Sequence, residues 1–284
     1  MVLSDRLVAQ LLPRDGGEWT PVTTGESGAR VFHDRARARY AKLVRAEQAQ
    51  GLAAERDRIA WLGETGIPAA AVLDWSVTDE GACLVTRAVA GVPADRLDAQ
   101  ALWSAWPAIA AVVRRLHDLP AAACPFGRGL EAMMPLARTT VAQGRVQPEF
   151  LPVELQRVPP ATILRRLEDE LAQRRAQEHG GQVVCHGDLC LPNVLVDPET
   201  LGVAGLIDVG RLGTADPYAD IALLLANARE TWPDEPAARR ADRHFAEHYG
   251  IDLDPDRQRF YLLLDPLTWP QDPTRDTAPG AVEP

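Results

Sequence analysis

The fold is decided by one stretch, VVCHGDLCLPNVLV, which occupies residues 183–196. An apolar run ends in His186-Gly187-Asp188, and a second apolar run begins directly after Asn193. Short apolar runs on both sides of a loop that contains Gly and Pro predict a strand, a tight loop and a second strand. The loop therefore presents a carboxylate, Asp188, and a carboxamide, Asn193.

A third apolar run, Val203 to Ile207, ends at Asp208 and is followed by Gly210. An acid, an amide five positions on, and a second acid after another strand form the pattern of a phosphoryl-transfer site. Protein kinases write it as H-R-D-x-x-x-x-N and D-F-G, whereas this chain has H-G-D-x-x-x-x-N and D-V-G. A lone Asp or Asn in a loop is usually a turn residue, but the joint match of spacing and strand context favours the functional interpretation.

The composition is that of an ordinary globular chain. The 284 residues are 46% hydrophobic and 25% charged, which suits one large domain or two lobes. No apolar run approaches the length of a membrane span, and the first residues lack the pattern of a signal peptide. We therefore expect a cytoplasmic protein without a membrane partner, and we expect a monomer.

Charge and cysteine usage narrow the partners further. The formal net charge of -10 disfavours nucleic acid and suits a cationic partner, although many proteins are acidic merely for solubility. The four cysteines form no Cys-x-x-Cys pair and lack further ligands at zinc spacing, so we expect free thiols in a reducing compartment. They are Cys83, Cys124, Cys185 and Cys190.

Lys42 is the single lysine among 30 basic residues. A lone lysine suggests a position that requires a compact ammonium rather than the planar fork of arginine. It lies in the expected strand Tyr40 to Val44, and Glu55 follows on an expected helix. Glu55 could aim Lys42 at nucleotide phosphates, with Glu47 as a rival partner. A surface lysine and a solvated glutamate are the alternative interpretation.

Two further segments suggest nucleotide binding. Gly25 to Gly28 lies between strand-like segments and fits a hairpin over phosphates, although an ordinary hairpin turn fits equally well. Two more strands are expected at 71–75 and 82–86, and Gly91 and Pro93 then end the sheet. We place a hinge between two lobes at about Thr86 to Gly91.

Downstream of the hinge the pattern is mainly helical. Helices are expected at 98–118, 161–178, 221–226, 236–249 and 256–264. We expect His117 to be a hydrogen-bonded packing residue and the basic run on the helix 161–178 to be solvated. The polar, Pro-rich end predicts a disordered tail. The expected lobes are 1–90 and 91–270, with the tail at 271–284.

From about Gly25 to Trp269 the chain resembles the aminoglycoside phosphotransferases, a kinase-like family. The broad resemblance lies in the His186-Gly187-Asp188 and Ile207-Asp208 segments. Within the family, GTAD at 213–216 and DPLTW at 265–269 resemble the streptomycin 3″ branch. The resemblance implies an α+β, protein-kinase-like fold with a small, mainly-β N-lobe and a larger, mainly-α C-lobe.

The resemblance also implies roles. Asp188 would orient the substrate hydroxyl or accept its proton, with no unusual pKa required, and Asp220 would brace the catalytic loop. The remaining expected roles are Mg²⁺ ligation by Asn193 and Asp208; ATP binding by Ser27, Gly28, Lys42 and Glu55, and at the hinge by Thr86 and Ala88; and contacts to a cationic drug by Asp188, Asp216, Glu230 and Asp265.

We therefore expect an ATP- and Mg²⁺-dependent kinase that phosphorylates the 3″-hydroxyl of streptomycin and inactivates it. One alternative is a kinase for another aminoglycoside or for a small amino alcohol such as choline or homoserine. A second alternative is a catalytically inactive protein that keeps the fold and binds a ligand.

Overall fold

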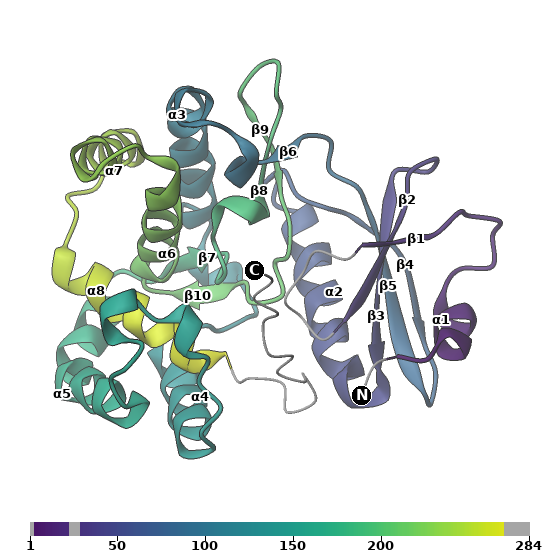
Figure 1. The fold of residues 1–284 in the computed structure, drawn as a ribbon, viewed down its shortest axis with the longest axis horizontal. Helices are drawn as coiled ribbons and strands as arrows, with labels where there is room; N and C mark the ends of the chain where they lie inside the picture. Colours follow the sequence, from purple (N-terminus) through teal and green to yellow (C-terminus); the bar gives the residue numbers. More distant parts are fainter. Residues whose placement is uncertain (1–2, 23–28, 270–284) are drawn as a thin grey trace, which may run out of the picture.

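The computed structural model describes residues 3–22 and 29–269, which form two lobes (Figure 1). The N-lobe is built on a five-stranded antiparallel sheet with the strand order β1-β2-β3-β5-β4. The C-lobe is mainly helical and contains two small antiparallel sheets, β10-β7 and β6-β8-β9. This is the α+β, kinase-like architecture that the sequence predicts.

The elements follow one another along the chain without a repeat. In the N-lobe they are α1 (Asp5–Leu11), β1 (Thr20–Val22), β2 (Arg30–Asp34), β3 (Arg39–Arg45), α2 (Ala49–Gly63), β4 (Val72–Val77) and β5 (Gly81–Arg87). In the C-lobe they are β6 (Val92–Pro93), α3 (Ala99–His117), α4 (Leu130–Ala142), α5 (Pro160–His179), β7 (Val183–Cys185), β8 (Val194–Val196), β9 (Val203–Leu206), β10 (Gly213–Ala215), α6 (Tyr218–Ala228), α7 (Glu235–Tyr249) and α8 (Pro255–Leu264).

The two faces of strand β3 place Lys42. Successive side chains of a strand point to opposite faces of the sheet. Ala41 and Leu43 are completely buried in the small core beneath α1. Val44 packs on the other face, in the large core that includes Leu62 of α2. Lys42 therefore lies on the face of the sheet that α2 covers, and α2 carries Glu55.

Helices α3 and α7 of the C-lobe begin at residues whose side chains cap them. Asp98 accepts from the Ala101 N–H at 2.8 Å before α3, and Asp234 accepts from the Ala237 N–H at 2.7 Å before α7. Such caps satisfy backbone donors that the helix cannot pair. The α7 helix ends at Gly250, whose φ of 83° is in the left-handed region.

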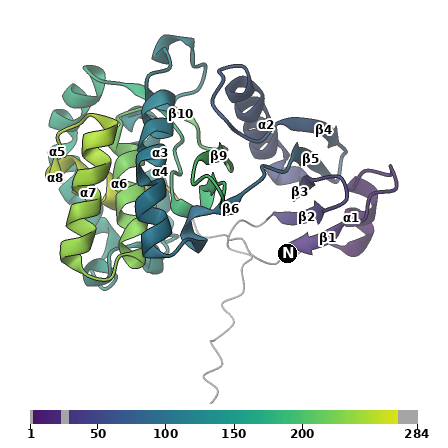
Figure 2. The ribbon, with the colours of Figure 1, turned by 90° about the horizontal axis from the view of Figure 1, so that it is seen from above.

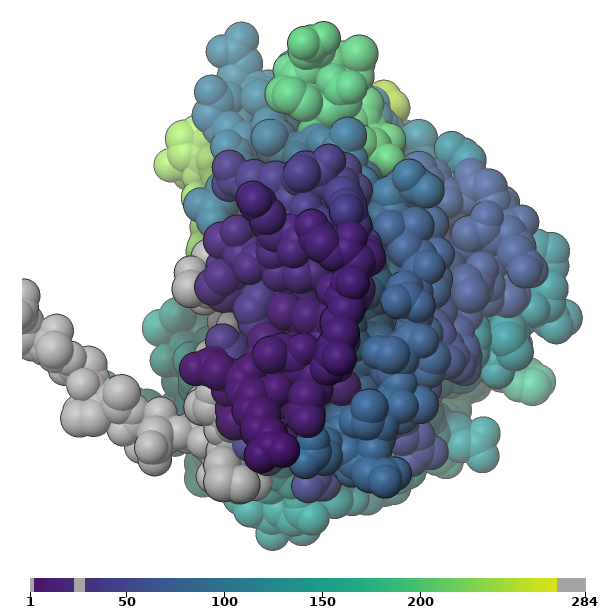
Figure 3. Space-filling view, turned by 90° about the vertical axis from the view of Figure 1, so that its right-hand side faces the viewer, coloured from purple at the N-terminus to yellow at the C-terminus, as the bar shows by residue number. Residues whose placement is uncertain are grey.

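Backbone hydrogen bonds join the lobes near the catalytic segment. The Leu206 N–H donates to the Pro68 carbonyl at 2.8 Å, and the Ala70 N–H donates to the Leu206 carbonyl at 3.2 Å. Strands β6 and β9 lie between the N-lobe sheet and the C-lobe helices (Figure 2). From the N-lobe side, the purple and blue N-lobe covers much of the front, with the C-lobe behind it (Figure 3). The predicted lobe boundary at residue 90 falls between β5 and β6, and we keep it as a proposal.

Two features depart from the sequence expectations. Helix α4 was not predicted, because Pro135 interrupts its pattern and its first N–H group is capped from far away, by Glu178 at 3.0 Å from Leu130 N. The basic run on α5 is not uniformly solvated: Arg174 is 3% exposed and donates to Glu170 at 2.7 Å. The predicted tail, 271–284, lies outside the described residues.

Within residues 3–22 and 29–269, no helix combines the length and the apolar character that crossing a membrane requires.

Candidate active site

The side chains of Lys42, Glu55 and Asp208 meet between the lobes. Lys42 Nζ donates to Glu55 Oε1 and Oε2, at 3.0 Å and 2.8 Å, and lies 3.3 Å from Asp208 Oδ1. Burial opposes the charge of Lys42, but the carboxylates of Asp208 and Glu55 outweigh it and raise the pKa of Lys42. The ammonium group therefore stays protonated. Glu47, the rival partner, is exposed, and both bonds of this pair go to Glu55.

Asp208 follows strand β9 and is partly open to solvent. Its φ is 57°, an uncommon value outside glycine, and its side chain is 50% exposed. The N–H of the preceding residue, Ile207, donates to the Asn193 carbonyl at 3.0 Å. This bond fixes the segment that carries Asp208 against the catalytic loop.

Asp188 and Asn193 are directly connected within the catalytic loop. The Asn193 side-chain amide donates to the Asp188 carbonyl at 2.8 Å and lies 3.4 Å from Asp188 Oδ2. These contacts use the amide nitrogen, so the amide oxygen is the atom that Asn193 can offer to a cation. Burial raises the pKa of Asp188 to about 6, while His186 acts in the opposite direction. The spacing of the motif does not predict this shift, and the group is still mainly ionised at neutral pH.

Gly187 explains why this loop reads H-G-D. Its φ is 83°, and a Cβ at this position would overlap the carbonyl of Arg211. Only glycine adopts this conformation and permits this approach without strain. The close contact connects the catalytic loop to the segment that follows Asp208.

Asp220 braces the catalytic loop from below, as the resemblance implies. Its Oδ2 accepts from the His186 N–H at 2.6 Å, and its Oδ1 accepts from the Gly187 N–H at 2.8 Å. The side chain is completely buried, and its hydrogen bonds hold the pKa low despite the burial. His117 also contacts Asp220, at 3.1 Å, so the prediction that this histidine is a hydrogen-bonded packing residue is confirmed.

The structure separates the three acids expected to contact a drug. Asp216 is 1% exposed; its Oδ2 is paired with Arg257 at 2.6 Å and its Oδ1 accepts from the Tyr218 N–H at 2.9 Å. A carboxylate that is buried and already paired with an arginine is not accessible to a cationic substrate in this structure. The burial therefore argues against the expected role of Asp216 as a drug contact. Glu230 is exposed and lies after α6, in a 3₁₀ turn.

Asp265 lies near Asp188 and is already paired with cations. Its carboxylate lies 3.3 Å from Arg128 Nη2 and 3.5 Å from Arg211 Nη1, and it accepts from the Trp269 indole at 3.0 Å. The Arg211 guanidinium also stacks on the Trp269 ring, 3.0 Å from the ring centre. A cationic substrate would therefore compete with two arginines for Asp265.

Sequence reasoning missed this cluster of Arg128, Arg211 and Trp269. The available signal was local, since Arg211 follows D-V-G and Trp269 ends DPLTW. Arg128 carried no such signal, because its partners lie far away along the chain: its Nη2 is 3.5 Å from the Gly187 carbonyl and 3.4 Å from Thr268 Oγ1.

Two of the expected nucleotide contacts, Thr86 and Ala88, lie at the end of β5 and just after it. Thr86 pairs with Tyr40 and Val72 on its two sides within the sheet. The Ala88 N–H donates to the Ala38 carbonyl at 2.8 Å, so the Ala88 carbonyl is the backbone group left for a base. Ser27 and Gly28 lie outside the described residues.

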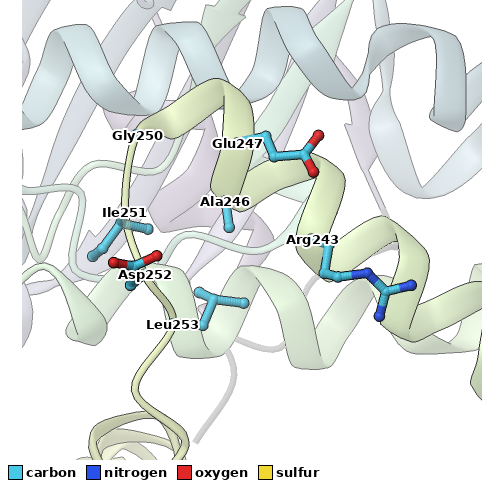
Figure 4. Close-up of a pocket in the computed structure, with 7 residues that line it drawn as sticks. All are labelled: Arg243, Ala246, Glu247, Gly250, Ile251, Asp252 and Leu253. Carbon is cyan, nitrogen blue, oxygen red and sulfur yellow. The ribbon is translucent and has the colours of Figure 1, made fainter.

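Two pockets differ in their relation to the catalytic loop. One, of about 390 Å³, borders the loop and is lined by Asp95, Leu97, Leu191, Pro192, Asn227, Glu230 and Thr231. The other, of about 490 Å³, lies at the turn between α7 and α8 (Figure 4). The second pocket contains none of the predicted site residues, and its lining residues are Arg243, Ala246, Glu247, Gly250, Ile251, Asp252 and Leu253.

The fold and these side chains place the protein among the phosphotransferases, and comparison agrees. Residues 18–261 match the model of the phosphotransferase enzyme family, and the chain belongs to this family. The chain is 63% identical to the streptomycin 3″-kinase of Streptomyces griseus over 254 residues, which cover 89% of this chain and 93% of that protein. It is 40% identical to an aminoglycoside 3′-phosphotransferase of Streptomyces fradiae over 261 residues, covering 87% and 94%.

Solved structures give the same result. Aminoglycoside phosphotransferase APH(3″)-Id of Streptomyces rimosus superposes with a TM-score of 0.90 at 54% identity, covering 95% of this chain and 100% of that chain. The same enzyme in complex with ADP and streptomycin gives a TM-score of 0.88, covering 93% and 98%.

Proposed function

We propose that this protein is a kinase that transfers the terminal phosphoryl group of ATP to the 3″-hydroxyl of streptomycin and so inactivates the drug. One observation carries the proposal: in a chain 63% identical to a streptomycin 3″-kinase, Lys42 lies within hydrogen-bond distance of both Glu55 and Asp208. These are the parts that kinases use to hold nucleotide phosphates.

Asp188 is proposed to orient the attacking hydroxyl and to receive its proton. Loose phosphoryl transfer depends mainly on alignment and charge, so an ionised carboxylate is sufficient. The Asn193 amide at 2.8 Å from the Asp188 carbonyl and the brace from Asp220 keep this carboxylate in place. Lys42, held by Glu55, would bind the phosphates of ATP.

The residues present fit Mg²⁺. A carboxylate with a half-exposed side chain, Asp208, and a carboxamide oxygen, that of Asn193, are the hard oxygen ligands that this ion prefers. Asp208 and Asn193 would hold it, and when bound it would neutralise charge on the phosphates. Lys42 pairs with both Glu55 and Asp208, so a cation beside Asp208 would add positive charge where two carboxylates lie close to one ammonium group.

The drug is proposed to bind beside the catalytic loop, through Glu230 and Asp265. Streptomycin carries guanidinium groups, and exposed carboxylates near a site attract such cations. Glu230 lines the pocket at Leu191 and Pro192, together with Asp95. Asp265 lies close enough to Asp188 to raise the pKa of that carboxylate. The net charge of -10 favours the approach of a polycation.

The compartment and the assembly state are proposals too. ATP is available in the cytoplasm, and four cysteines that are free in this structure suit a reducing compartment. We propose that the enzyme works as a cytoplasmic monomer, since all the proposed catalytic residues come from one chain.

Product analysis tests the proposal. Purified protein is incubated with Mg-ATP and streptomycin, and the product is examined by mass spectrometry and NMR. We expect the mass of one added phosphoryl group, located at the 3″ oxygen. A phosphorylated product at another hydroxyl would change the assigned position, and absence of product together with phosphorylation of a 3′-hydroxyl drug would favour the activity of the Streptomyces fradiae relative.

A further inference from the structure

A buried chain of polar side chains leads from the catalytic loop to the end of helix α7. Asp220 Oδ2 lies 3.1 Å from His117 Nε2, and His117 Nδ1 lies 2.7 Å from the Tyr249 hydroxyl. The three residues come from helices α6, α3 and α7. Asp220 is completely buried, and His117 and Tyr249 are 4% and 6% exposed. A hydroxyl on α7 is thus connected through two side chains to the backbone beside Asp188.

The hydrogen positions follow from the partners. Asp220 accepts two backbone N–H groups of the catalytic loop, and as a carboxylate it also requires a donor from His117. The imidazole must therefore carry a proton on Nε2. In the neutral ring Nδ1 is then an acceptor, and the Tyr249 hydroxyl is its donor. Burial raises the pKa of Tyr249, so the hydroxyl keeps its proton.

The same place holds a group of possible metal ligands, which the hydrogen bonds already occupy. His117, Cys185 and Asp220 offer ligand atoms within 4.8 Å of one another. Both nitrogens of His117 and both oxygens of Asp220 are bonded, and the Cys185 thiol donates to the Asp216 carbonyl at 3.4 Å. Burial also raises the pKa of Cys185, which opposes the thiolate that a metal requires. The cluster is a hydrogen-bonded support.

We propose that Tyr249 is a positioning residue for phosphoryl transfer, acting through His117 and Asp220 on the catalytic loop. Its hydroxyl satisfies Nδ1 of His117 and so keeps Nε2–H directed at Asp220. Asp220 in turn holds the two backbone N–H groups that precede Asp188. Without the hydroxyl, a buried nitrogen loses its partner, and the imidazole reorients or changes protonation. The catalytic loop then loses part of its brace.

The ring of Tyr249 is fixed independently of its hydroxyl. It stacks on Phe245 with ring centres 5.7 Å apart and packs edge-on against the His117 ring at 5.5 Å. The Arg114 guanidinium lies 5.6 Å from its centre and donates to the Tyr249 carbonyl at 3.3 Å. Replacement by phenylalanine retains all of these contacts. Tyr249→Phe therefore removes the hydroxyl alone.

Steady-state kinetics with streptomycin and Mg-ATP test the proposal, which rests on the proposed function for this readout. Tyr249→Phe is expected to lower kcat by about five- to tenfold, with both KM values changed less than about twofold. Tyr261→Phe is the matched control, because this tyrosine is 2% exposed and its buried hydroxyl has no partner among the described residues. The control should retain the wild-type kcat. An unchanged kcat in Tyr249→Phe, or an equal loss in both variants, would overturn the proposal.

A double-mutant cycle separates a relay from a general weakening of the fold. In His117→Leu the side chain offers neither a donor to Asp220 nor an acceptor for the Tyr249 hydroxyl, so the connection is already broken. Adding Tyr249→Phe to this variant should therefore cost less than about twofold in kcat. The same five- to tenfold loss in both backgrounds would mean that Tyr249 acts independently of His117, and the relay would be wrong.

A measurement without substrate keeps this inference apart from the proposed function. The ¹⁵N NMR signals of His117 should report a protonated Nε2 and an unprotonated Nδ1 in the wild type, and both should change in Tyr249→Phe. The Tyr261→Phe spectrum should match the wild type. If wild-type protein fails to phosphorylate streptomycin, the function is wrong, and these signals still decide the inference: unchanged His117 signals in Tyr249→Phe would contradict it.

Discussion

Asp208 and Asp216 belong to the same short segment of chain, but their side chains differ in exposure and in the partners that they bind. The Asp208 side chain is 50% exposed and faces Lys42 at 3.3 Å. The Asp216 side chain is 1% exposed and is held by Arg257 at 2.6 Å. The Asp208 carboxylate is accessible to a ligand, whereas the Asp216 carboxylate is buried in an ion pair with Arg257. Exposure and partners, rather than residue type, separate acids that can bind a substrate from acids that hold the structure.

The same contrast applies to the acids around the catalytic loop. Asp188 is part of the catalytic loop, and within the described residues its carboxylate forms no ion pair with a cation. Asp220 is completely buried on α6. Its carboxylate accepts hydrogen bonds from two backbone N–H groups of the loop and contacts His117. We therefore expect substitutions of the accessible acids to impair turnover in a stable protein, and substitutions of the buried acids to impair stability first.

The largest expected effect is at one of the accessible acids, Asp188. Asp188→Ala should lower kcat by about 10³-fold, because no group remains to orient the hydroxyl and accept its proton. ATP binding should be retained, since the Lys42–Glu55 pair is untouched. Calorimetric titration with nucleotide and a turnover assay measure the two quantities. Turnover near the wild-type rate would show that the role assigned to Asp188 is wrong.

A smaller loss is expected at Lys42. Lys42→Met should lower kcat/KM for ATP by about 10²-fold, since the only ammonium near the phosphates is removed. Lys42→Arg is the matched control for charge, and we expect it to recover only part of the activity, because a planar fork does not fit a site built for a compact ammonium. Full activity in Lys42→Met would remove Lys42 from the nucleotide site.

Among the buried acids, Asp216→Ala should lower the free energy of unfolding by about 3 kcal/mol, because the Arg257 guanidinium is left without its partner in a mostly buried position. The KM for streptomycin should stay within about twofold of wild type in the folded fraction. Urea unfolding and kinetics measure the pair of quantities. A large rise in KM with unchanged stability would restore Asp216 as a drug contact.

Glu230 is the open counterpart of Asp216. Glu230→Gln should raise the KM for streptomycin by about three- to tenfold while the unfolding midpoint stays the same, because an exposed carboxylate contributes little to the fold. The effect should weaken at high salt, which screens exposed charges. Loss of stability without a change in KM would place Glu230 with the structural acids.

The smallest expected effect concerns the thiols. Burial raises the pKa of Cys83 to about 12 and raises the pKa of Cys190 as well. An ordinary cysteine becomes mainly thiolate as the pH rises through 8.5, but these two should remain thiols. Alkylation of the folded protein at pH 9, followed by peptide mass spectrometry, should leave both unmodified, whereas unfolded protein should react. Rapid modification of Cys190 in the folded state would mean that the catalytic loop is open.

The part of the site that could be predicted consists of residues that lie a few positions apart in the sequence. Strand, loop and strand fix the distance from Asp188 to Asn193, and the next strand delivers Asp208. The period of two along β3 then decides which face Lys42 occupies. Such patterns are local, so a single sequence is enough to reveal them.

The remainder depends on partners that are distant in the chain. In the sequence Asp216 resembles a substrate-binding acid, but in the fold it pairs with Arg257. No residue pattern near Arg128 in the sequence indicates that it lies beside Gly187. Helix α4 likewise depends on Glu178, which satisfies its first N–H group. Spacing cannot predict burial of this kind, because the partner is chosen by tertiary packing.

The central claim, that the accessible acids form a streptomycin kinase site, is tested most directly by a coupled ADP-release assay with Mg-ATP. Streptomycin and kanamycin are compared as acceptors. We expect ADP release with streptomycin, none with kanamycin, and loss of the streptomycin signal in Asp188→Ala. ADP release with kanamycin alone, or with neither drug despite binding of ATP, would contradict it.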